Sequence, residues 1–455
     1  MKKFRPLLCL ALLTMGASAA TQARTSERHL SVPPEWTMEG QIQTVQGGIA
    51  PEEAGFILPH EHLFTNFFEP AERLGYRLEG PVPLPAARFF QSFGMLNVPD
   101  TPEKLAFWDR ADIDLSMIAK MREGAIKGDL DAFQNKNMAL LDRDSDAIYE
   151  VNQFREFGGK TIVDVTVDGI GRSPKRLQRV SEVTGVNIVM GTGWYRWPFH
   201  PDWLKKKSVD DLAQMMINDI VFGVDGSSIK SGIIGEIPID PYSVVVSGAL
   251  LSSEELATRR RAQMQRANAA DAALSDVIES DELKVLRAAA RAARATGAAL
   301  SLHYLTSSLQ PLDIIEAEGL PLDRVIVGHA DSLLKYHEGA ARKMLARGVT
   351  LELDYGLQYT AVQGPVNEAQ KQILDTAAKF ILEGHEKQIL LSHDMCGRLN
   401  LSRYGGSGLT WISTFVIPYL RRAGVNDAQI RSITVDNPKR LLTFARPMPT
   451  ARRSR

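Results

Sequence analysis

Short apolar runs alternate with amphipathic segments along most of the chain. Most of these runs are near-continuous rather than strictly alternating, which is typical of parallel strands buried on both faces. The runs lie at 55–60, 161–167, 186–191, 232–236, 298–303, 324–329, 349–354 and 388–393. The clearest helical patterns between them lie at 146–157, 209–221, 282–296, 333–347 and 367–382. Strand-then-helix units in this order predict an α/β fold, the (β/α)8 TIM barrel.

The first residues follow a different pattern, because a basic start is followed by an apolar stretch and small residues up to Ala23. This succession is typical of a secretory signal peptide, and the apolar stretch is too short to span a bilayer. We therefore expect a signal peptide at 1–23 and an exported protein, in the periplasm if the source is bacterial. No later stretch is expected to cross a membrane.

The remaining chain divides into an N-terminal arm (24–40), a barrel (41–447) and a basic C-terminal tail (448–455). Two connections within the barrel, at about 63–143 and 238–278, are too long for simple loops between a strand and a helix. We expect them to be insertions at the C-terminal rim of the barrel, where active-site covers usually lie.

Charge and cysteine content narrow the possible functions. The 455 residues carry 53 Lys and Arg against 54 Asp and Glu, a net charge of −1, which does not favour nucleic-acid binding. Two cysteines exclude a disulfide scaffold. The expected partner is a small-molecule substrate, and a homodimer remains open.

The chemically active side chains gather at the ends of the predicted strands. His60 and His62 are two residues apart, so an extended backbone points both imidazoles to one side. The other candidates at strand ends are Glu236, His303, His329 and Asp394. Because parallel strands of a barrel end at one mouth, these six side chains are expected to meet there.

Histidine with carboxylate suits zinc or a similar divalent ion. Four histidines and two carboxylates exceed one tetrahedral site, so we predict two divalent metal ions, most readily zinc. A bridging carboxylate would hold the ions about 3.5–4 Å apart with a hydroxide between them. His393 should point to the opposite side from Asp394 if the strand stays extended.

Seven segments at and near the strand ends resemble the phosphotriesterase family of the amidohydrolase superfamily. They are GFILPHEH (55–62), TIVDVT (161–166), GTGWY (191–195), GIIGEI (232–237), VGH (327–329), LSHD (391–394) and NP (437–438). The resemblance covers about residues 41 to 445 apart from the two insertions. DGSSIK (225–230) and YGG (404–406) look most like the branch of phosphotriesterase homology and phosphotriesterase-related proteins.

The resemblance implies a role for each ligand candidate. His60, His62 and Asp394 would bind the more buried metal, and His303 and His329 the more exposed one. Glu236 would bridge the two ions, as in the related-protein branch, where the best-known branch uses a carboxylated lysine. Tyr355 follows Asp354 where phosphotriesterases carry a histidine and lactonases an arginine, which disfavours paraoxon-like and homoserine-lactone substrates.

The expected function is a binuclear metal-dependent hydrolase whose bridging hydroxide attacks an ester-type bond in a carboxyl ester, lactone or organophosphate. The catalytic candidates are Asp394, which would collect the proton, and Tyr195, which would orient the nucleophile or polarise a carbonyl. The expected substrate pocket consists of Trp194, Tyr195, Trp197, Tyr355 and Cys396. Two alternatives are an amidase acting on a small N-acyl compound and a non-catalytic exported solute-binding barrel.

Overall fold

The computed structural model describes residues 30–69, 119, 140–239, 251–268, 280–304, 306–354, 356–361 and 368–448. The predicted signal peptide lies outside the described residues, as do most of the two predicted insertions and all of the tail except Met448. Tyr355 also lies outside them.

Each of the eight predicted strands is present, and together they form one parallel sheet in chain order. The strands are β3 (Phe56–Glu61), β6 (Gly159–Asp164), β7 (Asn187–Thr192), β8 (Ile233–Ile239), β9 (Leu300–Tyr304), β10 (Val325–Gly328), β11 (Thr350–Leu353) and β12 (Ile389–Leu391). The two edge strands meet beyond their ends, where the Asp394 amide donates to the His60 carbonyl at 3.1 Å. The Ser392 hydroxyl donates to the same carbonyl at 2.8 Å, so the sheet closes almost completely into a barrel. The predicted TIM barrel is confirmed.

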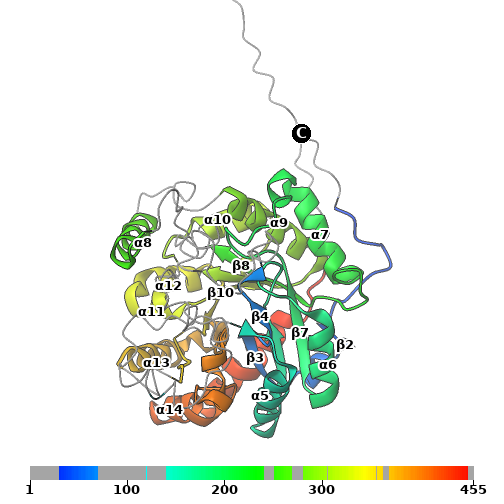
Figure 1. Cartoon of the computed structure of the whole chain (residues 1–455). Coiled ribbons are helices and arrows are strands. Elements are labelled where there is room, and N and C mark those ends of the chain that lie inside the picture. Colours follow the sequence, from blue (N-terminus) through cyan, green and yellow to red (C-terminus); the bar gives the residue numbers. More distant parts are fainter. Residues whose placement is uncertain are drawn as a thin grey trace, which may run out of the picture.

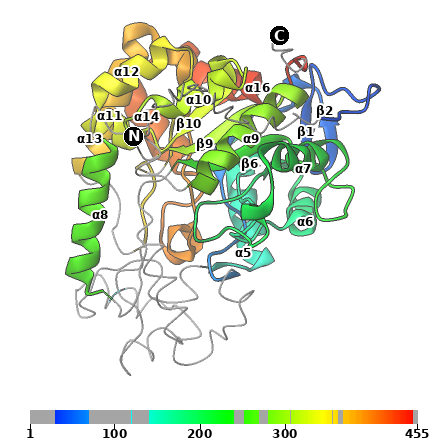
Figure 2. The same ribbon diagram turned by 90° about the horizontal axis from the view of Figure 1, so that it is seen from above.

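Helices surround the strands, as Figure 1 shows, while α8 stands apart at one side (Figure 2). The helices of six residues or more are α5 (Asp144–Glu156), α6 (Pro174–Thr184), α7 (Val209–Val221), α8 (Ser253–Ala267), α9 (Ser280–Thr296), α10 (Gln310–Ala317), α11 (Asp331–Tyr336), α12 (Glu338–Ala346), α13 (Glu368–Phe380), α14 (Ile417–Arg422) and α16 (Asn437–Leu442). The described residues also include a shorter helix, α15 (Asp427–Arg431), and two small antiparallel strand pairs. The pairs are β1 (Ile42–Thr44) with β2 (Gly47–Ile49), and β4 (Thr65–Asn66) with β5 (Leu140–Leu141). Within the described ranges no helix is long and apolar enough to cross a membrane.

One predicted helix, 333–347, is wrong in its continuity. The structure has α11 and α12 instead, and the chain breaks at His337, whose φ of −139° and ψ of 43° are not helical. Leu334 before the break and Met344 after it are both buried. Because the apolar pattern continues through the break, hydrophobic periodicity does not reveal it.

The strands alternate between a helix-facing side and the barrel interior, with register shifts in β3 between Leu58 and Glu61 and in β8 between Ile234 and Ile237. One apolar cluster gathers a residue from each of several strands, among them Ile57, Val163, Val189, Ile326 and Leu390. Their sequence neighbours, such as Ile188 and Val325, belong to the larger cluster that includes the helices. The interior cluster fills the barrel, and the polar residues further along the same strand faces lie at the mouth.

Candidate metal centre

The alternation of β9 and β11 shows how the sequence delivers polar groups to the mouth. Ala299 belongs to the interior cluster, and Ser301 and His303 follow it at steps of two. On β11, Leu351 and Leu353 pack outward, so Thr350, Glu352 and Asp354 face inward. All of these inward side chains are buried.

The structure brings together all six predicted ligands. His60, His62 and Asp394 form one group whose nitrogen and oxygen atoms lie within 4.8 Å of one another. Glu236, His303 and His329 form a second group at the same limit. These are the two sets expected from the family resemblance, with Glu236 in the set of the more exposed metal.

Glu236 lies between the histidines of both groups. Its Oε2 is 3.4 Å from His60 Nε2 and 3.9 Å from His329 Nε2, and its Oε1 is 3.5 Å from His62 Nε2. Asp394 Oδ1 lies 3.1 Å from His62 Nε2. Two ligands bound to one zinc ion at about 2.0–2.1 Å in tetrahedral geometry are roughly 3.3 Å apart. The spacing therefore fits side chains arranged around ions.

Three buried atoms at this centre make no hydrogen bond among the described residues, namely His60 Nε2, Glu236 Oε2 and His303 Nδ1. A buried polar atom without a partner costs about 1–3 kcal/mol. A pair of divalent ions, one in each group, would satisfy all three, and nitrogen with carboxylate oxygen is the donor set that zinc takes. The residues present therefore fit a metal centre.

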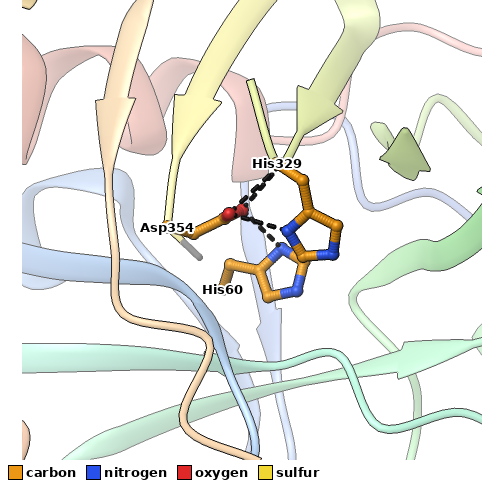
Figure 3. Close-up of side chains that lie close together, drawn as sticks. All are labelled: His60, His329 and Asp354. Atoms are coloured by element: carbon orange, nitrogen blue, oxygen red, sulfur yellow. Dashed lines mark hydrogen bonds and ion pairs between the residues drawn. The ribbon is translucent and has the colours of Figure 1, made fainter. Parts of the chain in front are cut away.

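The outer nitrogens of the histidines are held by groups that the sequence analysis missed as part of the site. His62 Nδ1 lies 2.8 Å from Thr166 Oγ1, and His60 Nδ1 lies 3.1 Å from Glu352 Oε2. Asp354 Oδ1 lies 2.7 Å from His329 Nδ1, as Figure 3 shows. Histidines that bind metals are typically oriented in this way through their second nitrogen. Glu352 and Asp354 alternate with apolar residues along β11, and this pattern could have identified both of them from the sequence.

Burial and neighbouring charges pull the pKa values of the centre apart. Burial opposes protonation of His60, but Asp354, Glu236 and Glu352 outweigh it and raise the pKa of His60 well above its usual value. Burial and the neighbouring His329 lower the pKa of His303 well below its usual value. For Glu236, burial favours the neutral acid, but His303 and His60 outweigh it and lower the pKa. The carboxylate is thus kept ionised, as a metal ligand must be.

The backbone is unusual at two of the predicted ligands. Among the described residues other than glycine, only Asp225, His329 and Asp394 have a positive φ, and the values for the last two are 56° and 54°. Such left-handed conformations are sparsely populated outside glycine and cluster at functional sites. Just before Glu236, Gly235 has a φ of 126°, and a Cβ there would lie 2.3 Å from the Ser301 carbonyl oxygen. Glycine is therefore required at 235.

Tyr195, one of the pocket candidates, reaches a predicted ligand directly. Its hydroxyl lies 3.2 Å from His303 Nε2. Burial and the neighbouring Glu236 raise the pKa of Tyr195 well above its usual value, so the phenol keeps its proton. Cys396 packs against the cluster that contains Phe67, Val167, Ile170, Tyr195 and Phe199, and so borders the same place.

The two tryptophans are placed differently. The Trp194 indole donates to Asp168 Oδ2 at 3.0 Å and packs edge-on against Trp203, within the packed layer outside the barrel. The Trp197 amide donates to Glu282 Oε1 on α9 at 3.0 Å. The Trp194 ring therefore contacts Asp168 and Trp203, whereas the Tyr195 hydroxyl lies beside His303.

His393 lies next to Asp394 but faces away from the centre. Its Nδ1 is 2.7 Å from Glu61 Oε1, and its Nε2 accepts a hydrogen bond from the Ile412 amide at 3.2 Å. His393 therefore anchors the end of β12 to β3 and to the chain that follows, as its place in an extended strand predicts.

A (β/α)8 barrel that gathers histidines and carboxylates around unsatisfied atoms at its mouth belongs to the class of metal-dependent barrel hydrolases. The model of the phosphotriesterase family matches residues 40–253 and 268–442. The chain belongs to the phosphotriesterase family, as the motifs of its strand ends predict.

The relatives extend over nearly the whole chain. An N-acetyltaurine hydrolase from Dictyostelium discoideum is 28% identical over 414 residues, covering 89% of this chain and 98% of that protein. A phosphotriesterase-related protein from Nematostella vectensis is 28% identical over 419 residues, covering 89% and 99%. The human N-acetyltaurine hydrolase is 27% identical over 420 residues, covering 90% and 99%. Hydrolase activity is the chemistry that the family and these names support.

Solved structures agree on the fold. A resiniferatoxin-binding protein from Rhodobacter sphaeroides is 30% identical, with a TM-score of 0.66, and the match covers 89% of this chain and 95% of that one. The phosphotriesterase homology protein of Escherichia coli, with phosphate in its active site, is 24% identical, with a TM-score of 0.56 and coverage of 86% and 99%. The second similarity concerns the fold alone.

Proposed function

We propose that this protein is a metal-dependent hydrolase that cleaves the amide bond of a small N-acyl compound. The proposal of metal-dependent hydrolysis is supported by the buried atoms of His60, Glu236 and His303 that make no hydrogen bond among the described residues at the mouth of the barrel. The amide part is supported by relatives named N-acetyltaurine hydrolase that match nearly end to end. The amidase alternative of the sequence analysis thus takes precedence over an ester-type bond.

Two divalent ions, most readily zinc, would be held by the six clustered side chains. His60, His62 and Asp394 hold one ion, His303 and His329 hold the other, and Glu236 is shared. When bound, such a pair polarises a substrate oxygen and lowers the pKa of water, so that a nucleophile forms near neutral pH.

Asp394 is the proton acceptor in this proposal. It is 6% exposed at the mouth, and its Oδ1 faces His62. Its carboxylate takes the proton released when water attacks the amide carbon and passes that proton to the departing amine nitrogen. An amide needs this second transfer because an unprotonated amine is a poor leaving group.

Tyr195 orients the substrate oxygen. If His303 uses its unpartnered Nδ1 as a ligand, its Nε2 carries a hydrogen and donates it to the Tyr195 oxygen, 3.2 Å away. The phenol hydrogen is then available for the carbonyl oxygen of the substrate. The apolar neighbours of Tyr195, among them Phe67 and Phe199, suit a small acyl group rather than a charged one.

An assay panel tests this proposal. Initial rates for N-acetyltaurine and other N-acyl amino acids, aryl esters and lactones are compared on the zinc-loaded protein. We expect the largest kcat/KM for an N-acyl substrate and a loss in Tyr195→Phe. The matched control is Tyr336→Phe, because Tyr336 is 67% exposed at the end of α11. Turnover of esters or lactones with none of N-acyl compounds would replace the amide proposal by an ester one. Tight ligand retention without any hydrolysis would favour a solute-binding barrel.

We further propose that the chain is exported after removal of residues 1–23, on the basis of its N-terminal sequence. N-terminal sequencing of the native protein should return a start near Ala20 or Arg24. A start at Met1 or Lys2 would contradict export by this route.

A further inference from the structure

One carboxylate on the outer side of the candidate metal centre contacts histidines of both proposed metal positions. Asp354 is fully buried, with Oδ1 2.7 Å from His329 Nδ1 and Oδ2 3.3 Å from His60 Nδ1 (Figure 3). His60 belongs to the group with His62 and Asp394, and His329 to the group with Glu236 and His303. Asp354 is therefore placed to act on both groups.

The position of Asp354 is itself fixed by the backbone. The His329 amide donates to both carboxylate oxygens, at 3.2 and 3.1 Å. The Asp354 amide donates to Asp331 Oδ2 at 3.1 Å, which ties the end of β11 to the start of α11. A carboxylate held from several directions can impose an orientation on the rings that it contacts.

His60 and His329 lie between two carboxylates. Their Nδ1 atoms face Asp354, and their Nε2 atoms lie 3.4 and 3.9 Å from the same oxygen of Glu236. The ring centroids are 5.2 Å apart. A shift of Asp354 would thus change the direction in which both Nε2 atoms point.

We propose that Asp354 is a positioning residue that couples the two metal positions, so that its loss weakens the binding of both ions together. It holds His329 by a hydrogen bond and lies 3.3 Å from His60 Nδ1, and both contacts favour the proton on Nδ1, which leaves Nε2 of each neutral ring as the ligand atom. The inference rests on the metal centre of the proposed function.

Glu352 provides the matched comparison on the same strand. It is also fully buried and two residues away, but its hydrogen bond within the site goes to His60 alone, at 3.1 Å. Glu352 should therefore influence the position that contains His60 and leave the other ion bound. The two carboxylates differ in how many metal positions they contact, whereas their burial is the same.

A third metal site made by His60, His329 and Asp354 is the competing interpretation, since their ligand atoms also lie within 4.8 Å of one another. The 2.7 Å separation of Asp354 Oδ1 and His329 Nδ1 is that of a direct hydrogen bond. Two ligands of one tetrahedral zinc ion would lie roughly 3.3 Å apart, so the shorter separation fits a hydrogen bond better than a shared ion. The geometry favours the positioning role.

The experiment measures metal per chain by elemental analysis at a series of buffered free zinc concentrations, for the wild type, Asp354→Asn and Glu352→Gln. We expect two ions in the wild type. In Asp354→Asn both should need about 10–100-fold more free zinc. In Glu352→Gln the titration should split into two steps, with one ion weakened and the other unchanged. Circular dichroism of the metal-free proteins checks that each variant is folded.

Several results would overturn the proposal. They are a folded Asp354→Asn that loses one ion or none, a Glu352→Gln titration identical to that of Asp354→Asn, or a third ion in the wild type that Asp354→Asn lacks. If Asp354→Asn does not fold, Asp331→Asn replaces it, because it loosens the Asp354 backbone while keeping the Asp354 charge. It should weaken both ions together by a smaller factor, and loss of one ion alone would count against the coupling. A folded wild type without any metal would instead defeat the proposed function itself.

Discussion

Both ends of the barrel contain buried ionisable side chains, but the groups that contact those side chains differ between the two ends. At the base, Arg324 donates to the backbone carbonyls of Gly297, Arg440, Leu441 and Thr443 at 2.8–3.1 Å. At the mouth, ionisable side chains face one another, and three of their atoms have no hydrogen bond among the described residues. At the base, backbone carbonyls accept from both terminal nitrogens of Arg324, although its Nε makes no hydrogen bond among the described residues, whereas the mouth gathers side chains that could bind an ion.

This difference separates stability from function. A buried cation held by backbone carbonyls ties the C-terminal segment to the barrel, and its loss removes a charged donor from each of those carbonyls. A buried cluster of like and unlike charges in which some atoms are unsatisfied stabilises little by itself and is typical of a binding site. Substitutions at the mouth should therefore reduce activity more than stability, and substitutions at the base should do the reverse.

The largest effect on activity is expected for Glu236→Ala. One carboxylate serves both proposed ions, so both should be lost, and turnover should fall by at least about 10³-fold. Metal content by elemental analysis and kcat/KM on the best N-acyl substrate check this. Full metal content in the folded variant would show that Glu236 is not the shared ligand.

The neighbouring pair Asp394 and His393 gives an internal contrast at the mouth. Asp394→Asn keeps the shape but loses the basic oxygen, so turnover should fall about 10²–10⁴-fold. His393→Asn breaks the contact with Glu61 and should lower the free energy of unfolding by about 1–3 kcal/mol with little change in kcat of the folded protein. Near-normal turnover in metal-loaded Asp394→Asn would refute its role as proton acceptor.

At the base, Arg324→Met should lower the free energy of unfolding by about 3 kcal/mol, because several backbone carbonyls lose a charged donor. Metal content and kcat/KM of the folded protein should stay as in the wild type. Denaturant unfolding measures the free energy of unfolding, and steady-state kinetics measure kcat/KM. The control is Arg259→Met, because Arg259 is exposed on α8. If Arg324→Met lost activity without losing stability, the claim that the base serves stability and the mouth serves activity would be wrong.

The smallest effect on stability is expected at Glu318, which follows α10 and contacts Arg287 and Arg291 of α9. Burial favours the neutral acid, but hydrogen bonds from Arg291 and Arg287 outweigh it and lower the pKa of Glu318 below its ordinary 4.5. A lowered pKa stabilises the fold above about pH 4.5, and this contribution is lost as the pH falls through the folded-state value. Glu318 is 9% exposed, but the side chain of its partner Arg287 is 48% exposed, so solvent screening should limit the effect to about 1 kcal/mol. The difference in unfolding free energy between wild type and Glu318→Gln should shrink from pH 7 to pH 3, and a constant difference would contradict this.

The sequence predicted the barrel because a buried parallel strand has a local signature. Each predicted run contains or overlaps an observed strand, with ends that differ by a few residues, as at 161–167 against Gly159–Asp164. His60 and His62 could be assigned to one side from the period of two, and the other ligand candidates from their place at strand ends. These features depend on the local sequence alone.

Contacts between distant strands could not be predicted in this way. Thr166 next to His62, and Asp354 between His60 and His329, become visible only when β3, β6, β10 and β11 are placed around the barrel. The same holds for Trp194, which shares a motif with Tyr195 but points its indole toward Asp168. Adjacent residues on a strand end face opposite sides, and the motif alone does not say which one faces the centre.

The most direct test of the central claim, that the mouth is a two-metal hydrolytic centre, is a metal titration followed by activity. The protein is stripped with a chelator, divalent metal is returned stepwise, and bound metal per chain is measured together with hydrolysis of the best N-acyl substrate. The account predicts two bound ions, no turnover in the stripped protein, and full turnover only as the second ion binds. Turnover by the folded metal-free protein, or a folded protein that binds no divalent ion, would contradict it.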